Sequence, residues 1–260
     1  MQGIGNDFVV VNHADVKGAD LSALAKWVSN RRTGVGADGL LVLNSNPLEM
    51  HMWNPDGSEA EMCGNGVRCA AKRFADLGWS ESEFEIGTGA GPIRLKVLAD
   101  GRVAVEMGQA KFLRGEIGMN GPSDQEFLDQ PLEGGLKGTA VSMGNPHLVI
   151  PVADVAAVDL AFVGPRLERL ALFPNRVNVH FVQVLSRQKL LQRTWERGAG
   201  ITLACGTGAC AVAAASWKLG LAEKSVDVKL PGGHLQIDVG DDFSVTMTGP
   251  AVKVFEGALP

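Results

Sequence analysis

Two kinds of hydrophobic pattern recur along the chain. Residues 93–97 and 102–107 alternate apolar and polar positions, which is typical of half-buried β-strands. Residues 20–31 instead place leucine and valine at positions i, i+3 and i+7, which indicates an amphipathic helix that begins after Asp20. The short apolar run 40–43 is typical of a short strand. The chain therefore predicts strands and helices in mixed order.

The same patterns predict the remaining elements. We expect a turn and strand within 5–12, and further strands at 40–43, 50–53, 93–97, 102–107, 140–143, 178–184, 190–194, 235–239 and 243–247. Helices are expected at 20–31, from Cys63 to Gly78, at 160–172, and from Cys205 to Gly220. Residues 115–138 are polar, contain glycine and are expected to be irregular.

A repeat underlies this order of elements. Cys63-Gly64-Asn65-Gly66 recurs as Cys205-Gly206-Thr207-Gly208, and the offset between the cysteines is 205 − 63 = 142. The alternating segment 91–97 recurs at 233–239 with the same offset, and Gly5-Asn6 recurs as Gly144-Asn145. Several landmarks in one order at a nearly constant offset indicate an internal duplication.

The duplication determines the expected fold class. We expect an α+β protein of two pseudo-symmetric domains, each a mixed or antiparallel curled sheet around a central helix. The N-terminal half is expected to span 1–110, with 251–260 returning to it, and the C-terminal half to span 111–250. The active site is expected in the cleft between the domains.

Composition excludes several classes of protein. The 260 residues carry a net charge of −5 with scattered Lys and Arg, so no nucleic-acid partner is expected. No apolar run approaches ~18 residues and no signal peptide is visible, which predicts a cytoplasmic protein without membrane contact. The four cysteines are spaced unlike zinc ligands and are expected to be reduced, so no metal site is predicted.

Each repeated cysteine precedes a run of small residues that predicts a helix. A helix N-terminus carries unpaired N–H groups and the positive end of the helix dipole, which stabilise a thiolate and bind an anion. Two such thiols facing one α-carbon could remove a proton from one face and return one to the other. No lysine lies in an evident cofactor context, so we infer no pyridoxal-dependent route and no other cofactor.

Long motifs in this chain closely resemble the diaminopimelate epimerase family. They include Gly3-x-Gly5-Asn6-Asp7-Phe8, Asn54-x-Asp56-Gly57-Ser58, Glu61-Met62-Cys63-Gly64-Asn65-Gly66, Met143-Gly144-Asn145-Pro146-His147, Trp195-Glu196-Arg197-Gly198 and Leu203-Ala204-Cys205-Gly206-Thr207-Gly208. The resemblance covers nearly the whole chain. It implies an isomerase of lysine and cell-wall precursor synthesis, an amino-acid epimerase that converts L,L-diaminopimelate to the meso isomer without a cofactor and acts as a homodimer.

The resemblance also implies roles for individual residues. Cys63 and Cys205 are the two acid/bases, and the backbone N–H groups of Gly64, Asn65, Gly206 and Thr207 hold the reacting carboxylate. The substrate site is lined by Asn6, Asn54, Asn145, Asn178, Glu196 and Arg197. His147 is either a structural histidine or a group that supports this site from behind. The chain departs from the family pattern at Gly39, where some members have a substrate-contacting glutamine, and at Ile201, where glutamate is common.

Three other hypotheses for the function of the two cysteines remain open. The nearest is another two-thiol racemase of the same fold, acting on proline, hydroxyproline or histidine. A second is a binding module that uses the two helix N-termini for an anion without catalysis. A third is a redox pair in which Cys63 and Cys205 form a disulfide.

Overall fold

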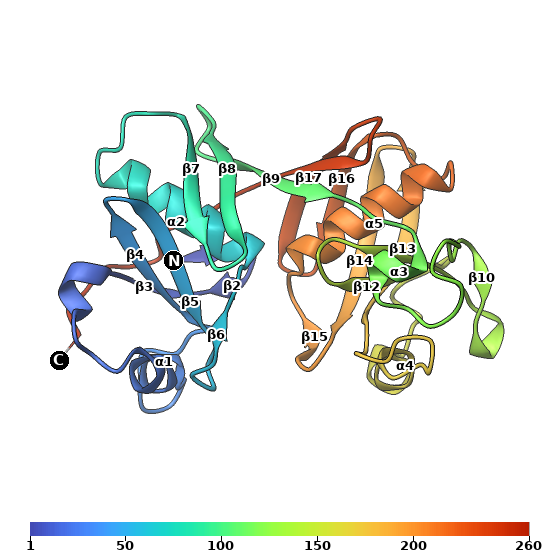
Figure 1. Ribbon diagram of the computed structural model, residues 1–260, viewed down its shortest axis with the longest axis horizontal. Helices are drawn as coiled ribbons and strands as arrows, with labels where there is room; N and C mark the ends of the chain where they lie inside the picture. The colour runs from blue at the N-terminus through green and yellow to red at the C-terminus, as the bar shows by residue number, and fades with distance from the viewer. Residues whose placement is uncertain (260) are drawn as a thin grey trace. The chain divides into compact units, whose positions relative to one another are not determined.

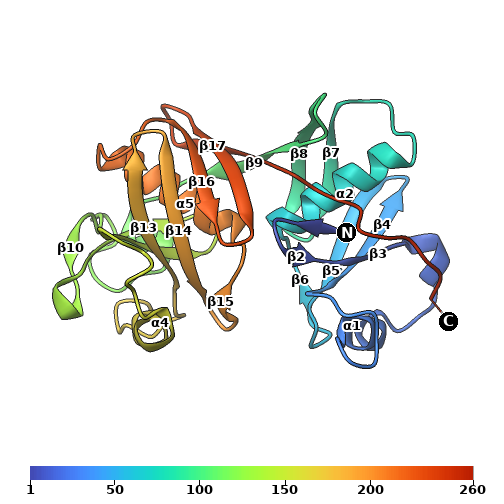
Figure 2. The same cartoon turned by 180° about the vertical axis from the view of Figure 1, so that it is seen from behind.

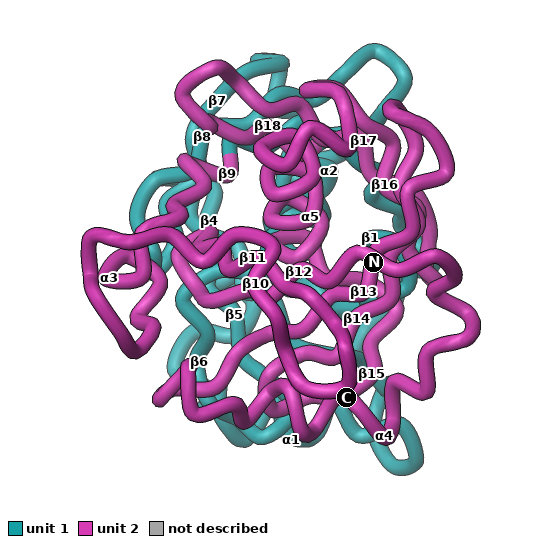
Figure 3. Tube along the Cα trace, turned by 90° about the vertical axis from the view of Figure 1, so that its right-hand side faces the viewer, with its two compact units in different colours: residues 1–106, 248–260 teal, residues 107–247 magenta. Residues whose placement is uncertain are grey.

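Two compact units make up the chain in the computed structural model, which describes residues 1–259. Unit 1 contains residues 1–106 and the residues from 248 onward, and unit 2 contains residues 107–247 (Figure 3). The chain passes from unit 1 to unit 2 within β9 (Val103–Gln109) and returns within β18 (Ser244–Gly249). Unit 1 is therefore built from two separate parts of the sequence.

Unit 1 combines short strands with two α-helices (Figure 1). Its elements before β9 are β1 (Gln2–Gly3), β2 (Asn6–Asp7), β3 (Val9–Asn12), the 3-10 helix η1 (His13–Val16), α1 (Leu21–Ser29), β4 (Leu40–Ser45), β5 (Leu48–Trp53), β6 (Glu59–Ala60), α2 (Gly64–Asp76), β7 (Glu83–Thr88) and β8 (Gly91–Val97). The main sheet runs β8-β7-β5-β4-β3. Its neighbouring strands are alternately antiparallel and parallel, because β3/β4 and β5/β7 are parallel while β4/β5 and β7/β8 are antiparallel.

Unit 2 repeats this topology. Its elements before β18 are α3 (Arg114–Ile117), β10 (Gln130–Pro131), the 3-10 helix η2 (Glu133–Gly135), β11 (Lys137–Ser142), β12 (Pro146–Pro151), α4 (Leu160–Glu168), β13 (Asn178–Ser186), β14 (Lys189–Glu196), β15 (Gly200–Thr202), α5 (Gly206–Lys218), β16 (Ser225–Leu230) and β17 (Gly233–Val239). Here β12/β13 and β14/β16 are parallel while β13/β14 and β16/β17 are antiparallel. Strands β12 to β17 thus correspond one to one to β3 to β8, and α4 and α5 to α1 and α2.

Helices α2 and α5 are each enclosed by the sheet of their own unit. Nine of the 13 residues of α2 and ten of the 13 residues of α5 are buried, which distinguishes both from a surface helix with one buried stripe. Helix α2 contacts β4, β5 and β8, and the two opposite views of Figures 1 and 2 show it lying along these strands. Helix α5 contacts β11 to β14, β16 and β17. The predicted α+β class with a central helix in each unit is confirmed.

Strand β4 illustrates why an uninterrupted apolar run is needed beside a central helix. Leu40 and Val42 pack with Ala25 and Val28 of α1, whereas Leu41 lies against α2 on the other face. Both faces of the strand are covered, so it reads Leu-Leu-Val-Leu rather than alternating. Helix α1 begins where predicted, and the Asp20 carboxylate accepts the Ala23 N–H at 3.0 Å as its N-cap.

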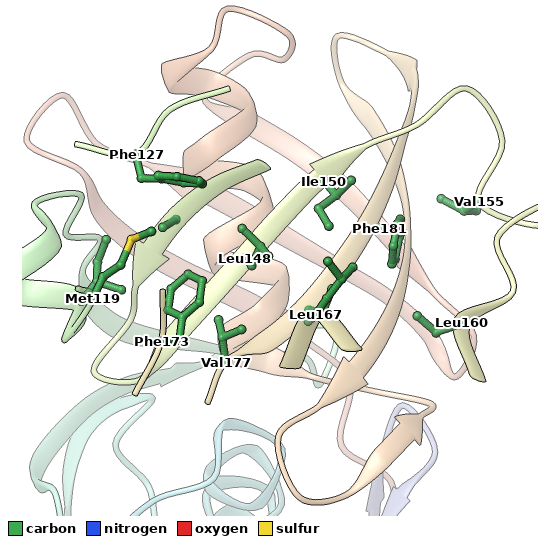
Figure 4. Close-up of a cluster of buried hydrophobic side chains, with 13 residues drawn as sticks. Met119, Phe127, Leu148, Ile150, Val155, Leu160, Leu167, Phe173, Val177 and Phe181 are labelled. Atoms are coloured by element: carbon green, nitrogen blue, oxygen red, sulfur yellow. The ribbon is translucent and has the colours of Figure 1, made fainter. Parts of the chain in front are cut away.

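In unit 2 the corresponding core lies between the sheet and α4. Figure 4 shows Leu160 and Leu167 of α4 together with Ile150 and Phe181 of the sheet. The side chain that precedes Phe181 on β13, His180, faces α5 instead. Strand β13 therefore separates an apolar core on one face from polar groups on the other.

Several sequence expectations differ from the structure in extent. Helix α4 ends at Glu168 instead of residue 172, because residues 170–173 form a separate turn before Pro174, closed by the Phe173 N–H donating to the Leu170 carbonyl. Residues 115–138 overlap the short helix α3 and contain β10 and η2. Strands β7, β12 and β16 were not predicted. No helix among residues 1–259 combines the length and apolar composition needed to cross a membrane.

Candidate active site

Cys63 and Cys205 occupy the same structural position, directly before the first turn of the enclosed helix. Both have extended backbone angles, φ −142° and ψ 120° at Cys63 and φ −134° and ψ 101° at Cys205. The Val67 N–H donates to the Cys63 carbonyl at 2.8 Å, and the Ala209 N–H donates to the Cys205 carbonyl at 2.9 Å. The N–H groups of the three residues between lie outside the helical ladder, so each thiol lies at a positively polarised helix end. The predicted helix starts are confirmed.

Around Cys63, unit 1 fixes the side-chain amide of Asn6. Asn6 Nδ2 donates to Asp38 Oδ2 at 2.8 Å, and a carboxylate can only accept, so Asn6 Oδ1 faces the other way. That oxygen accepts from Asn65 Nδ2 at 3.1 Å and lies 3.8 Å from Cys63 Sγ. Asp38 is in turn bound by Arg31. The structure therefore brings three predicted site residues, Asn6, Cys63 and Asn65, into direct contact.

The support for Asn6 rests on an exposed ionic cluster. Arg31 Nη2 lies 2.7 Å from Asp7 Oδ1 and 2.9 Å from Asp38 Oδ1, and the Arg31 side chain is 58% exposed. Partial burial opposes ionisation of Asp7, but hydrogen bonds from Arg31 and Asp38 outweigh it and lower the pKa of Asp7. The cluster therefore remains charged at neutral pH.

Arg68 supports the same site from inside α2. Its guanidinium is fully buried and donates to Asn65 Oδ1 at 2.8 Å, to the Gly64 carbonyl at 3.2 Å and to the Pro250 carbonyl at 3.2 Å. The Asn65 amide thus accepts a hydrogen bond from Arg68 through its oxygen and donates one to Asn6 through its nitrogen. A buried cation one turn into α2 adds to the positive potential of the helix N-terminus. The motif contains Arg68, but sequence reasoning gave it no role in the site.

Asn54 lies in a turn of its own. Its Nδ2 donates to Ser58 Oγ at 3.0 Å, and the Gly57 N–H donates to its carbonyl at 2.9 Å. These bonds close the turn between β5 and β6. The structure records no contact between Asn54 and the Asn6–Cys63–Asn65 group, so its predicted substrate contact stays a prediction.

The start of α5 is packed more tightly than the start of α2. Cys205 Sγ lies 3.9 Å from Thr207 Oγ1. A Cβ atom on Gly208 would fall 2.3 Å from His180 Cε1 and 2.9 Å from Cys205 Sγ, so only glycine fits. At the equivalent Gly66 the nearest atom is Leu41 Cδ2 at 3.2 Å. The glycine of the second motif therefore allows a buried histidine to approach the catalytic candidate.

A chain of buried polar side chains leads from that histidine to Asn145. His147 Nε2 lies 2.8 Å from Asn145 Oδ1, and His147 Nδ1 lies 2.8 Å from His180 Nε2. His180 Nδ1 lies 3.0 Å from Thr194 Oγ1 and 3.2 Å from Gln192 Nε2. Burial lowers the pKa of His180 to about 3, and burial, His180 and Arg197 hold the pKa of His147 well below its usual range. Both imidazoles are therefore neutral at physiological pH.

The turn that carries Glu196 and Arg197 is held by Asn178. Asn178 Oδ1 accepts the Arg197 N–H at 2.9 Å, and its Nδ2 donates to the Pro146 carbonyl at 3.1 Å. Asn178 thus ties the Arg197 turn to the segment that contains Asn145. Glu196 Oε1 accepts from Thr202 Oγ1 at 2.5 Å, and Arg197 Nη1 donates to the Asn175 carbonyl at 3.1 Å.

Glu168 holds the same turn from α4 and was not identified from the sequence. Its carboxylate accepts from Trp195 Nε1 at 2.8 Å, from the Gly198 N–H at 3.2 Å and from Arg176 Nη1 at 3.4 Å. Although the residue is only 3% exposed and burial favours the neutral acid, these donors lower the pKa of Glu168. The contacts with Trp195 and Gly198 span 27 and 30 residues of sequence, so no local pattern indicates them.

The other two cysteines lie inside the enclosed helices. None of the four cysteines forms a disulfide, and Cys69 and Cys210 are completely buried. Burial raises the pKa of Cys69 to about 12, which keeps this thiol protonated and unreactive. No cluster of His, Cys, Asp or Glu suited to a metal ion occurs within residues 1–259.

The fold is shared with several solved enzymes. A phenazine biosynthesis protein of the PhzF family from Bacillus anthracis superposes with a TM-score of 0.70 and 16% identity, covering 96% of this chain and 92% of that chain. A probable proline racemase from Agrobacterium radiobacter K84, with bound carbonate, superposes with a TM-score of 0.62 and 16% identity, covering 96% and 88%. Identities this low show a common fold and no more.

Sequence comparison is far more specific. The family model described as Diaminopimelate epimerase matches residues 1–113 and 139–254. Diaminopimelate epimerase from Moorella thermoacetica is 49% identical over 273 aligned positions, covering 100% of this chain and 98% of that protein. A match of this extent runs through both cysteine motifs and all the segments that surround them, and the chain belongs to the diaminopimelate epimerase family.

Proposed function

We propose that this protein epimerises L,L-diaminopimelate to meso-diaminopimelate, with Cys63 and Cys205 as the two acid/bases. The observation that carries the proposal is the equivalence of the two cysteines. Each precedes the enclosed helix of its unit, and each unit has the same strand topology. Inversion at a carbon needs two proton-transfer groups of similar chemistry, and a duplicated thiol at a duplicated helix start meets that requirement.

The proposed reaction needs no cofactor. The thiolate of one cysteine removes the α-proton, and the thiol of the other donates a proton to the opposite face of the resulting carbanion. The product leaves with its configuration inverted and with the two sulfurs exchanged between thiol and thiolate. The N–H groups of Gly64, Asn65, Gly206 and Thr207 hold the reacting carboxylate, where negative charge grows in the transition state.

Recognition of the far end of the substrate is assigned to Glu196 and Arg197. A guanidinium can bind a second carboxylate through two parallel hydrogen bonds, and a carboxylate can meet an ammonium group. Diaminopimelate carries both groups at its distal end. Proline and hydroxyproline have neither, so the distal pair argues for diaminopimelate over those substrates.

The test is proton exchange and epimerisation in heavy water. The purified enzyme with L,L-diaminopimelate should form the meso isomer and incorporate deuterium at the inverted carbon, while proline, hydroxyproline and histidine should not exchange. Each of Cys63→Ala and Cys205→Ala should lower turnover by roughly 10²–10⁴-fold, the range for loss of a general acid or base, and still bind substrate. Exchange of proline without exchange of diaminopimelate would show a racemase of the other class instead. Full turnover in both cysteine variants would refute the acid/base roles of the two thiols. Substrate binding without any turnover by the unaltered protein would indicate a binding module instead.

We also propose that the enzyme acts in the cytoplasm as a homodimer. The family resemblance supports this assembly. Light scattering of the protein as it elutes from a size-exclusion column at micromolar concentration measures the mass of the assembly. A mass of 27.4 kDa, that of one chain, would contradict a homodimer.

A further inference from the structure

Three buried polar side chains lie together in the interior of unit 2. His147, His180 and Gln192 are each completely excluded from solvent. Burying an imidazole or an amide is unfavourable unless its polar atoms find partners. Unit 1 supports its related asparagine, Asn6, through Asp38 and the buried Asn65 amide, without an imidazole. The buried cluster therefore calls for an explanation specific to unit 2.

The amide of Gln192 gives the cluster a direction. Its Nε2 donates to Thr194 Oγ1 at 2.9 Å, while its Oε1 has no donor among residues 1–259. Because the Thr194 oxygen accepts from Gln192, its own hydroxyl hydrogen is directed at His180 Nδ1, which lies 3.0 Å away. Leaving that buried hydroxyl hydrogen without an acceptor would cost more, so His180 Nδ1 is an acceptor.

The tautomers of both histidines follow from that donor. Because a neutral imidazole has one N–H, His180 carries its hydrogen on Nε2 and donates to His147 Nδ1 at 2.8 Å. His147 then carries its hydrogen on Nε2 and donates to Asn145 Oδ1 at 2.8 Å. With its oxygen bound in this way, Asn145 keeps both hydrogens of Nδ2 for another partner.

The chain is also held rigidly beside Cys205. The His180 ring lies so close to Gly208 that a Cβ atom there would fall 2.3 Å from Cε1. The ring is thus fixed by the α5 backbone on one side and by hydrogen bonds at both nitrogens. Asn145 is the half-buried end of this chain of hydrogen bonds, so the direction of the bonds can affect a bound substrate only through Asn145.

We propose that His180 and Gln192 are positioning residues that orient the Asn145 amide, so that it offers N–H donors, not a carbonyl oxygen, to the substrate carboxylate. This inference rests on the proposed epimerase function and deepens it. A carboxylate accepts hydrogen bonds and repels a carbonyl oxygen. A wrongly turned Asn145 would therefore weaken binding of the anionic substrate.

The direct test is the tautomeric state of the two histidines, measured by nitrogen-15 NMR of the imidazole rings in the intact enzyme. Both rings should show a protonated Nε2 and an unprotonated Nδ1 throughout pH 5.5–8. A protonated Nδ1 in either ring would overturn the inference. This readout does not require substrate, so it remains decisive even if the epimerase assay fails and the proposed function is withdrawn.

Kinetics then tests whether the direction matters to the substrate. His180→Leu removes the donor to His147 and should raise KM by about 10- to 100-fold, the value of a hydrogen bond to a charged group, with little change in kcat. Thr194→Ser is the matched control, because it changes the same end of the chain and keeps the hydroxyl that donates to His180 Nδ1, and it should change KM less than about threefold.

A double-variant comparison separates positioning from general damage. In an Asn145→Ala background, His180→Leu should have no further effect on KM, because the group that it orients is gone. An equal effect in both backgrounds would overturn the inference. If His180→Leu does not fold, Gln192→Leu takes its place, and its histidines should lose the single Nε2–H tautomer.

Discussion

The two units share a topology but support their related asparagines by different means. In unit 1, Asn6 is held by the exposed charged pair of Asp38 and Arg31, with side chains 41% and 58% exposed, and by Asn65, whose oxygen is bound by the buried Arg68. In unit 2, Asn145 is held by His147 and His180, neutral rings with no exposure. The comparison shows that both units keep the helix start with its thiol. The groups that orient nearby polar side chains differ, and they are charged in one unit and neutral in the other.

The two kinds of support should respond differently to perturbation. An exposed ion pair contributes little and is screened by salt, whereas a buried hydrogen-bond chain tolerates little change in shape or protonation. The predictions that follow test this contrast, starting with the largest expected effect.

The equivalent glycines Gly66 and Gly208 provide the sharpest comparison. Gly208→Ala would drive a methyl group into His180, which is fixed at both nitrogens, and should lower the free energy of unfolding by about 3 kcal/mol, with loss of activity. Gly66→Ala meets only the flexible end of Leu41, and alanine favours a helix, so the change should stay within about 1 kcal/mol. Urea unfolding measures both. Equal losses would contradict a tighter packing at α5.

Acidification should affect unit 2 before unit 1. The folded pKa of His180 is about 3, below its unfolded value near 6.5, so the unfolded state binds more protons between these values and stability falls as pH is lowered. For His180 alone the loss between pH 7 and pH 5 is about 2 kcal/mol. Asp7 and Glu168 also have lowered pKa values, but their contribution is lost only below about pH 4.5.

Urea unfolding at pH 7 and pH 5 measures this loss, and the His180→Leu variant should show a flatter dependence on pH. Hydrogen exchange at pH 5, followed by mass spectrometry, should show peptides from 107–247 losing protection before those from 1–106. A free energy of unfolding that is the same at the two pH values would contradict neutral buried histidines.

Glu168 should govern substrate affinity through the Glu196–Arg197 turn. Glu168→Gln keeps the size of the side chain but sets an amide N–H₂ against one of the donors from Trp195, Gly198 or Arg176. We expect KM to rise about tenfold, with a smaller change in kcat, because this turn carries the two residues proposed to recognise the substrate's far end. The double variant with Trp195→Phe removes one opposed donor and should recover part of the loss. A change in kcat alone would contradict this role.

The smallest effect is expected at the ionic support of unit 1. Asp38→Asn removes one partner of Arg31 but leaves Asp7, and the pair is exposed, so stability should change by less than about 1 kcal/mol. The change should shrink further between 0.05 and 0.5 M salt, because salt screens exposed charges. His180→Leu, measured in parallel, should be insensitive to salt. A larger or salt-independent effect at Asp38 would remove the contrast between the units.

Much of the fold could be predicted because its signals are local. The cap of α1 at Asp20, the strand at residues 40–43 and both cysteine helix starts each depend on fewer than about ten consecutive residues. Strand β16 places Val226, Val228 and Leu230 at alternate positions, so its local sequence also indicates a strand, although none was predicted there.

The supports of the site could not be predicted, because they join distant parts of the chain. Glu168 reaches a turn about 30 residues away, and Arg68 reaches the Pro250 carbonyl 182 residues away. His180 and Gln192 are indistinguishable from ordinary strand residues in the sequence. Only the ladder between β13 and β14 pairs His180 with Thr194 and brings Gln192, two residues before Thr194, within 3.2 Å of the His180 ring. Residue type indicates a capacity for hydrogen bonding, but only the folded chain selects the partner.

The discontinuous make-up of unit 1 has a consequence for synthesis. A ribosome releases the chain from residue 1 onward, and unit 2 is complete in the sequence by residue 247. Unit 1 still lacks the Pro250 carbonyl for Arg68 and the Val252 partner of Gln2. Unit 2 can therefore fold first, while unit 1 still lacks one hydrogen-bond acceptor for the Arg68 guanidinium. Chaperone dependence should accordingly be concentrated in the half that is translated earliest.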